Sequence, residues 1–177
     1  MTFKLIVFFL LFTLSSNSQT PPSIENYGAI FKVEHPDFNT DTSQPFYAVF
    51  DVTKTFEDTA IPNKIIESAA RFIKLHREAG VPENSIKVAL VIHGAAIFDL
   101  LNHTEYEHQR KSNQAHNPNY DLLTALSQEG VQIILCGQTA GYRKITKTQI
   151  HPEVKIALSA MTALVQLQNE GYRLINF

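Results

Sequence analysis

Short runs of apolar residues alternate with longer amphipathic stretches along this chain. Residues 46–52, 86–93 and 131–136 are rich in β-branched and aromatic side chains, a pattern typical of buried strands, and residues 172–177 supply a last strand. Between the strands, residues 61–79 place apolar side chains at helical spacing, and shorter helices are predicted over 95–101 and from Asn117-Pro118 to about Glu129. This order predicts a three-layer α/β/α sandwich with a mainly parallel sheet.

Two segments have a less regular pattern. Residues 102–116 are polar, and we expect a mobile loop or lid there. Residues 152–171 are mostly apolar and predict one long helix, opened by Pro152 and closed by Gly171. Its polar residues form one narrow stripe: Lys155, Ser159, Thr162, Gln166 and Asn169. Such a helix would be buried on most sides, against the sheet and then either against another subunit or under the N-terminal arm.

The N-terminal part of the chain predicts export. Lys4, an apolar core over residues 5–14 and small polar residues from Ser15 onward have the pattern of a secretory signal peptide, with cleavage after Ser18. The apolar run is shorter than the roughly 20 residues that a membrane span needs, so we expect no stable span once residues 1–18 are removed. Residues 19–45 are predicted to form an extended arm, and residues 46–177 the α/β domain. The expected location is periplasmic or secreted.

Composition narrows the classes of partner. The chain has 177 residues, of which 44% are hydrophobic and 18% charged, as expected for one globular domain with a sizeable core. A formal net charge of -2 provides no basic surface, so we expect no nucleic-acid binding. The expected partners are proteins or small molecules.

The only cysteine, Cys136, stands at the end of a buried strand. Because the carboxyl ends of parallel strands share one edge of the sheet, Asp51, His93 and Cys136 are expected to lie within reach of one another. A thiol becomes reactive as its thiolate, which nearby positive charge from His93 or Arg143, or amides of the turn after Cys136, would favour.

The glycines beside these residues suggest a second feature of the edge. Gly94 and Gly137 have no side chain and would let a substrate approach the backbone closely. The turn that would supply the amides runs from Gly137 to Ala140 and includes Gln138.

Several sharper motifs are excluded. Arg143 lies seven residues after Cys136, whereas the Cys-x5-Arg phosphatase loop requires six. The turn after Cys136 lacks the lysine of a P-loop, and the chain contains no GxGxxG fingerprint. The spacing of His103, His108 and His116 fits no common pair of metal ligands, so we expect neither a metal nor a cofactor.

Four segments together resemble the DsrE/DsrF-like family, over roughly residues 46–177. They recur in order and at fitting distances: His93-Gly94-Ala95, Asn117-Pro118-Asn119, Cys136-Gly137-Gln138, and the apolar stretch over 158–164. The resemblance implies a parallel five-stranded sheet between helices, assembly into trimers or hexamers, and sulfur relay through a persulfide on the strand-end cysteine, here Cys136. The signal peptide departs from the sulfur-relay members, which work in the cytoplasm, so the sulfur donor and acceptor stay unknown.

Three hypotheses of function follow. In the first, the protein is an exported sulfur carrier or sulfurtransferase that holds a persulfide on Cys136, with His93 or Arg143 favouring the thiolate. Gly94, Gly137, Gln138 and Arg143 would then surround the substrate. In the second, it is a hydrolase with Cys136 as nucleophile, His93 as base and Asp51 as the residue that orients the base. In the third, it is a non-catalytic oligomeric binding module in which Cys136 is merely packed.

Overall fold

The computed structural model describes residues 20–111 and 116–176. Within them, five strands form one sheet in the order β4-β3-β2-β1-β5, and every pairing is parallel. The strands are β1 (Phe46–Val52), β2 (Ile86–Ile92), β3 (Gln132–Cys136), β4 (Lys155–Ala157) and β5 (Arg173–Ile175). The predicted α/β fold with a parallel five-stranded sheet is therefore confirmed. The predicted signal peptide, residues 1–18, lies outside the described residues.

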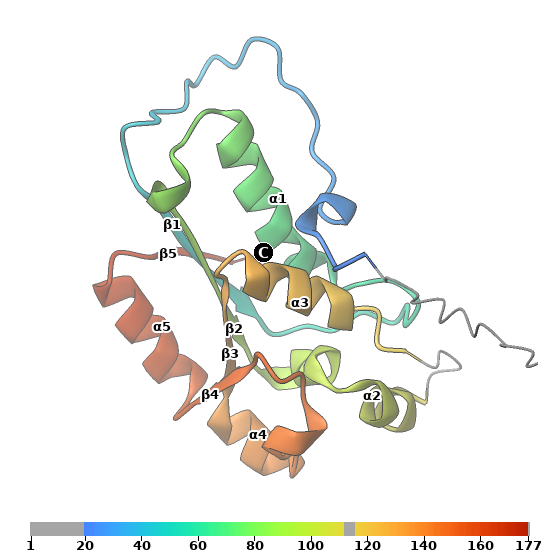
Figure 1. Cartoon of the computed structure of the whole chain (residues 1–177). Helices are drawn as coiled ribbons and strands as arrows, with labels where there is room; N and C mark the ends of the chain where they lie inside the picture. Colours follow the sequence, from blue (N-terminus) through green and yellow to red (C-terminus); the bar gives the residue numbers. More distant parts are fainter. Residues whose placement is uncertain (1–19, 112–115, 177) are drawn as a thin grey trace, which may run out of the picture.

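Helices cover both faces of the sheet (Figure 1). The α1 helix (Lys64–Glu78) and α3 helix (Tyr120–Gln128) lie on one face, and α5 (Ala160–Asn169) contacts β1, β2 and β3 from the other. At the carboxyl ends of the strands lie α4 (Gly137–Arg143), the 3-10 helix η3 (Gly94–Leu100) and α2 (His103–Arg110). Three further 3-10 turns complete the elements: η1 (Ile24–Asn26), η2 (Glu83–Ser85) and η4 (Lys147–Gln149).

Alternate residues of the central strands divide the core in two. Phe50 and Leu90 face α1 and α3, whereas Val49 and Val91 face α5, and all four side chains are buried. Burying one side chain of this size stabilises the fold by about 1.5–3 kcal/mol. Because both faces are covered, these strands read as continuous apolar runs, which is why the sequence identified them.

The first helix begins later than its apolar pattern predicts. The side chain of Asn63 accepts a hydrogen bond from the Ile65 amide at 2.9 Å, so α1 begins at Lys64 and not at residue 61. Asn63 also donates to the buried carboxylate of Asp99 at 2.6 Å, and its own amide donates to Asn119 at 2.7 Å. This network joins the start of α1 to η3 and to the turn before α3.

The prediction of a loop or lid over residues 102–116 was wrong for residues 103–110, which form α2. Asn102 caps this helix by accepting from the Glu105 amide at 2.9 Å. The helix buries only Tyr106, so its sequence has no apolar stripe to reveal it.

The prediction of one helix over residues 152–171 was also wrong. Residues 155–157 form β4, and the chain then turns at Ser159, whose hydroxyl caps α5 by accepting from the Thr162 amide at 3.0 Å. Lys155 therefore lies on a strand, and the polar stripe of five residues does not exist as one helical face. The α5 helix is also more exposed than predicted, with Met161 75% and Val165 57% exposed.

The N-terminal segment is anchored on the opposite side from α5. Residues 20–45 contain one regular element, η1, which contacts α1 and α3 through the buried side chain of Ile24. Gly28 has φ +57°, and a Cβ there would lie 2.6 Å from the Glu67 carbonyl oxygen. The arm therefore does not cover α5, which excludes that alternative for the apolar helix.

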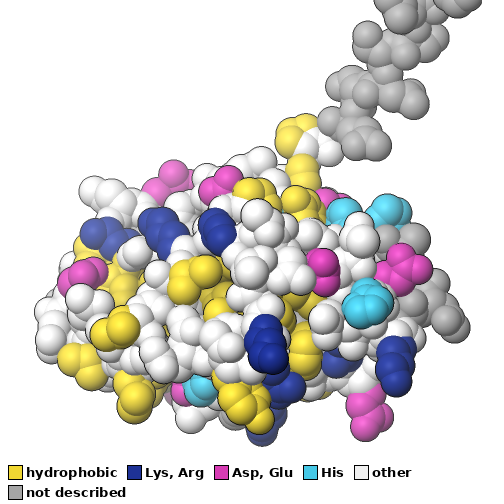
Figure 2. All heavy atoms as spheres, turned by 90° about the horizontal axis from the view of Figure 1, so that it is seen from below, with side chains coloured by type: hydrophobic (Ala, Val, Ile, Leu, Met, Phe, Trp, Pro, Cys, Tyr) yellow, Lys and Arg dark blue, Asp and Glu magenta, His cyan; other side chains and the backbone are white. Residues whose placement is uncertain are grey.

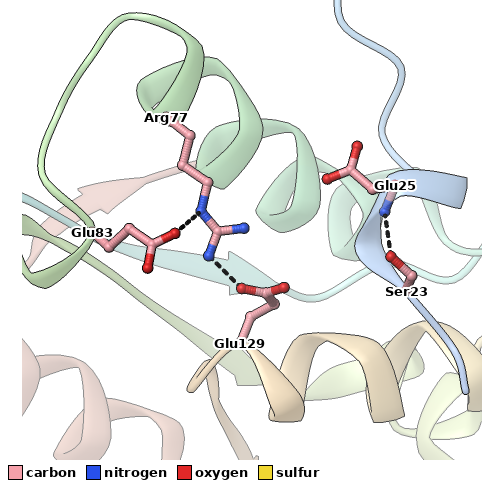
Figure 3. A network of polar contacts seen from close by, with 5 residues as sticks. All are labelled: Ser23, Glu25, Arg77, Glu83 and Glu129. Carbon is pink, nitrogen blue, oxygen red and sulfur yellow. Dashed lines mark hydrogen bonds and ion pairs between the residues drawn. The ribbon is translucent and has the colours of Figure 1, made fainter.

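A polar network closes the amino-terminal edge of the sheet (Figure 3). Arg77 near the end of α1 forms ion pairs with Glu83 of η2, at 3.4 Å, and with Glu129 at the end of α3. A cavity of about 570 Å³ lies beside it, lined by residues of this edge such as Lys87 and Gln132. It opens at the end of the sheet opposite to Cys136.

A search of the described helices for a stretch long and apolar enough to cross a membrane finds none.

His151 is a buried histidine held in its neutral form. Its Nδ1 accepts from the Glu153 amide at 3.3 Å, so Nε2 carries the proton and donates to Thr124 Oγ1 at 2.9 Å. Burial lowers the pKa of His151 to about 4, and the nearby charge of Lys147 adds to this effect while Glu153 opposes it.

This histidine makes stability depend on pH. The unfolded chain protonates His151 below about pH 6.5, whereas the folded chain resists protonation until about pH 4, so its contribution is full above that range and is lost as the pH falls. In urea denaturation, the cost of His151→Gln should be about 2 kcal/mol smaller at about pH 5 than at about pH 7. The wild type and the variant both contain Asp99, so the titration of Asp99 cancels when their free energies of unfolding are compared. An equal cost at both pH values would contradict the assignment.

Candidate functional site

Cys136 ends β3, and α4 begins at the next residue. The strand carries the cysteine to the carboxyl edge of the sheet, on the face that α5 covers. Only 6% of the residue is exposed. The predicted edge site is thus built around a nearly buried thiol.

Backbone amides and one hydroxyl act on the sulfur of Cys136. Burial raises the pKa of this thiol, but the amide and hydroxyl of Thr139, the amide of Ala160 and the amide of Gln138 together outweigh burial and lower the pKa below its ordinary value. Cys136 makes no side-chain capping hydrogen bond to the first turn of α4, so these donors act on the sulfur as oriented dipoles. The site therefore favours a thiolate without a cation.

The Ala160 amide reaches the sulfur because two segments of backbone pack unusually closely. A Cβ on Gly137 would lie 2.5 Å from the carbonyl oxygen of Ala157 and 3.3 Å from that of Leu158. Gln138 Nε2 donates to the same Leu158 carbonyl at 3.1 Å. These contacts hold the connection between β4 and α5 against the start of α4, and so place the first turn of α5 beside Cys136.

Thr139 is a site residue that the sequence interpretation missed. Its hydroxyl oxygen accepts from the Gly94 amide at 3.4 Å and its side chain also acts on Cys136. Thr139 thus links the end of β2 to the thiol at the end of β3. The sequence could have indicated Thr139 as a site residue, because it is a hydroxyl residue three positions after a strand-end cysteine, in the first turn of a helix.

Asp51 and His93 form a pair at the same edge. His93 Nε2 lies 2.8 Å from Asp51 Oδ1, and the two side chains are partly exposed. The predicted proximity of these two residues is therefore found. Within the described residues, however, no hydrogen bond joins His93 to Cys136, so the contact between base and nucleophile that the hydrolase hypothesis needs is not made.

The remaining predicted site residues have other roles in the structure. The guanidinium of Arg143 lies over the rings of Phe98 and Tyr142, at 5.2 and 5.7 Å from their centroids, and neither it nor His93 is among the groups that shift the pKa of Cys136. The groups that lower the thiol pKa most are the Thr139 amide and hydroxyl and the amides of Ala160 and Gln138, and the effect expected of His93 or Arg143 stays a prediction.

Both glycines are required by backbone packing. Gly94 has φ +61°, and a Cβ there would lie 3.0 Å from the Thr53 carbonyl oxygen. Gly137 packs against Ala157 as described above. Their proposed contact with a substrate stays a prediction.

Apolar side chains are exposed next to the site. Leu158, Met161 and Val165 lie on the connection between β4 and α5 and on the outer side of α5. Figure 2 views the molecule from the carboxyl end of the sheet and shows hydrophobic side chains at the surface in several places, with charged side chains among them. In the described residues, no cluster of three or more His, Cys, Asp or Glu side chains could hold a metal ion.

The sequence profile of the DsrE/DsrF-like family matches residues 48–177, which is most of the chain. The chain belongs to the DsrE/DsrF-like family. No curated protein matches the chain.

Solved structures with the DsrE-like fold match across almost their whole length. The ychN protein from E. coli aligns with a TM-score of 0.53 and 17% identity, and the protein of unknown function MTH1491 from Methanobacterium thermoautotrophicum with 0.51 and 16%. Each alignment covers 75% of this chain and 99% of the other. At this identity the likeness establishes the fold of this DsrE-like chain alone.

The close approach at Gly137 can be tested by adding one methyl group. Gly137→Ala should lower the free energy of unfolding by about 1–3 kcal/mol, because the new Cβ collides with backbone that cannot move aside cheaply. Gly141→Ala, in the same helix and with nothing within 4 Å of its added Cβ, is the matched control and should raise stability by about 0.5–1 kcal/mol. Urea denaturation of the two variants measures both values. Equal effects would mean that the contact of Gly137 with Ala157 does not constrain the edge.

Proposed function

We propose that this DsrE-like protein accepts and carries sulfane sulfur as a persulfide on Cys136. The family is related to sulfur relay, and the observation that supports the finer proposal is the set of donors from Thr139, Ala160 and Gln138 around one thiol. A persulfide forms when a thiolate attacks the outer sulfur of a donor, so a site that favours the thiolate promotes this step.

The surroundings of Cys136 also suit the persulfide once it has formed. A persulfide is an anion with its charge on the outer sulfur, and amide donors stabilise such a charge without binding it covalently. The low exposure of Cys136 limits access of water and of larger oxidants.

We further propose that the protein is exported and assembles as a homo-oligomer, a trimer or hexamer. The first statement rests on the pattern of residues 1–18 and predicts a mature chain that begins at Gln19, as N-terminal sequencing would show. The second rests on the exposed apolar side chains of Leu158, Met161 and Val165, which a second copy would bury. A protein that sediments as a monomer at micromolar concentration would contradict it.

Sulfur loading tests the proposal directly. Purified protein exposed to polysulfide should gain the mass of one sulfur atom on Cys136, and a reducing agent should remove it. The Cys136→Ser variant should gain none. Intact-protein and peptide mass spectrometry identifies the adduct and its position. If Cys136 takes up no sulfur under conditions that load a known persulfide carrier, and also resists alkylation in the folded protein, the thiol is a packing residue and the protein a binding module.

A further inference from the structure

Asp51 and His93 form a pair that has no role in the uptake of sulfur by Cys136 as proposed above. His93 Nε2 lies 2.8 Å from Asp51 Oδ1, so one ring nitrogen is engaged by a carboxylate. The other, Nδ1, has no hydrogen-bond partner among residues 20–111 and 116–176. About 30% of the His93 side chain is exposed, so a bound molecule can reach it.

Strand register places His93 beside the thiol. Ile92, the last residue of β2, is paired with Leu135 of β3, so His93, directly after β2, and Cys136, the last residue of β3, are neighbours at the carboxyl edge. Adjacent strands lie about 4.8 Å apart. A second link confirms the closeness: the amide of Gly94, the residue after His93, donates to Thr139, whose side chain acts on Cys136.

All three side chains leave the sheet on one face. Val49 and Val91 belong to the core under α5. Asp51 follows Val49 by two residues on β1, and His93, whose backbone is extended directly after β2, follows Val91 by two. Cys136 belongs to the same core. A molecule bound at the thiol is therefore also beside His93.

The donors that lower the pKa of Cys136 come from α4 and α5. A histidine beside the thiol can act on the molecule that the thiol reacts with. In a sulfur transfer that partner is the leaving group of the donor.

We propose that His93, held by Asp51, donates a proton to the thiolate that leaves the donor when Cys136 takes up sulfur, and that the donor is accordingly an alkyl persulfide. This inference rests on the proposed sulfur-carrying function and specifies its substrate class.

The step balances without an oxidant or a reductant. The Cys136 thiolate attacks the outer sulfur of R–S–SH and forms the new bond from Sγ to that sulfur. The bond between the two donor sulfurs breaks, and its electron pair leaves with R–S⁻. The proton on Nδ1 of the His93 imidazolium passes to R–S⁻, which gives R–SH, neutral His93 and Cys136 as Sγ–SH.

The need for such a proton depends on the leaving group. A basic alkyl thiolate is a poor leaving group, whereas a weakly basic one leaves readily without help. Asp51 keeps Nε2 engaged, so the proton that His93 can transfer is the one on Nδ1. Asp51 is in this scheme a positioning residue that acts through His93.

Two neutral disulfides that differ in their leaving group test the proposal. The probes are 2-hydroxyethyl disulfide, which releases an alkyl thiolate, and 4,4′-dithiodipyridine, which releases a weakly basic aromatic thiolate. His93→Gln should slow the reaction of Cys136 by about 100-fold with the first probe and by less than about threefold with the second. Asp51→Asn should also slow the reaction more with the first probe than with the second, but by a smaller factor than His93→Gln. Rates are compared only for variants whose circular dichroism spectrum matches that of the wild type, because an unfolded chain exposes Cys136 to both probes.

His108→Gln, at an exposed histidine on α2, is the matched control and should behave as the wild type. An equal loss with both probes, or no loss with either, would overturn the role of His93. Glutathione persulfide, tested in parallel, separates the two proposals: a wild-type protein that reacts with the disulfides but retains no sulfur from this donor contradicts the sulfur carrier, while the disulfide ratio still decides on His93.

Discussion

The close packing of the Gly137 backbone against the Ala157 carbonyl is the constraint on which the candidate site depends. It is possible only because residue 137 has no side chain and because β4 is paired with β3 up to Cys136 and Ala157. The packing holds the start of α5 beside the start of α4, so that amides from two elements distant in the sequence act on one sulfur. Without it, Cys136 would keep the donors of its own turn and lose the Ala160 amide.

The electrostatics of this edge are divided between two groups of residues. Dipoles of the backbone and the hydroxyl of Thr139 act on the thiol, while His93 on the neighbouring strand is hydrogen-bonded to Asp51, and its second ring nitrogen has no partner in the part of the chain that the structure describes. Dipoles fixed in the fold need no counter-ion and are little affected by salt, unlike an exposed ion pair. The arrangement separates the residues that stabilise the thiolate from those that serve its reaction partner.

The sequence predicted the parts of this structure that have a strong local pattern. The runs at β1, β2 and β3 are mostly apolar because both faces of the sheet are covered, and their order placed Asp51, His93 and Cys136 at one edge. In contrast, β4 has only three residues and is paired with β3 alone. A strand this short shows no alternation of its own, so the sequence pattern merged it with the helix that follows. The α2 helix buries one side chain, and only its Asn102 cap distinguished it from a loop. The groups that donate to the Cys136 sulfur could not be identified from the sequence, because most are backbone amides, which do not depend on the type of side chain. The direction of these amides depends on the packing at Gly137.

The central claim, that fixed backbone dipoles and the Thr139 hydroxyl lower the pKa of Cys136, is tested most directly by measuring that pKa. Because Cys136 is the only cysteine, the ultraviolet absorbance of its thiolate can be followed against pH, with Cys136→Ser as the tyrosine background. We expect the apparent pKa of Cys136 in the folded protein to lie below that of the same thiol in the urea-unfolded chain. A value at or above it would show that burial outweighs the amides, and would contradict the account.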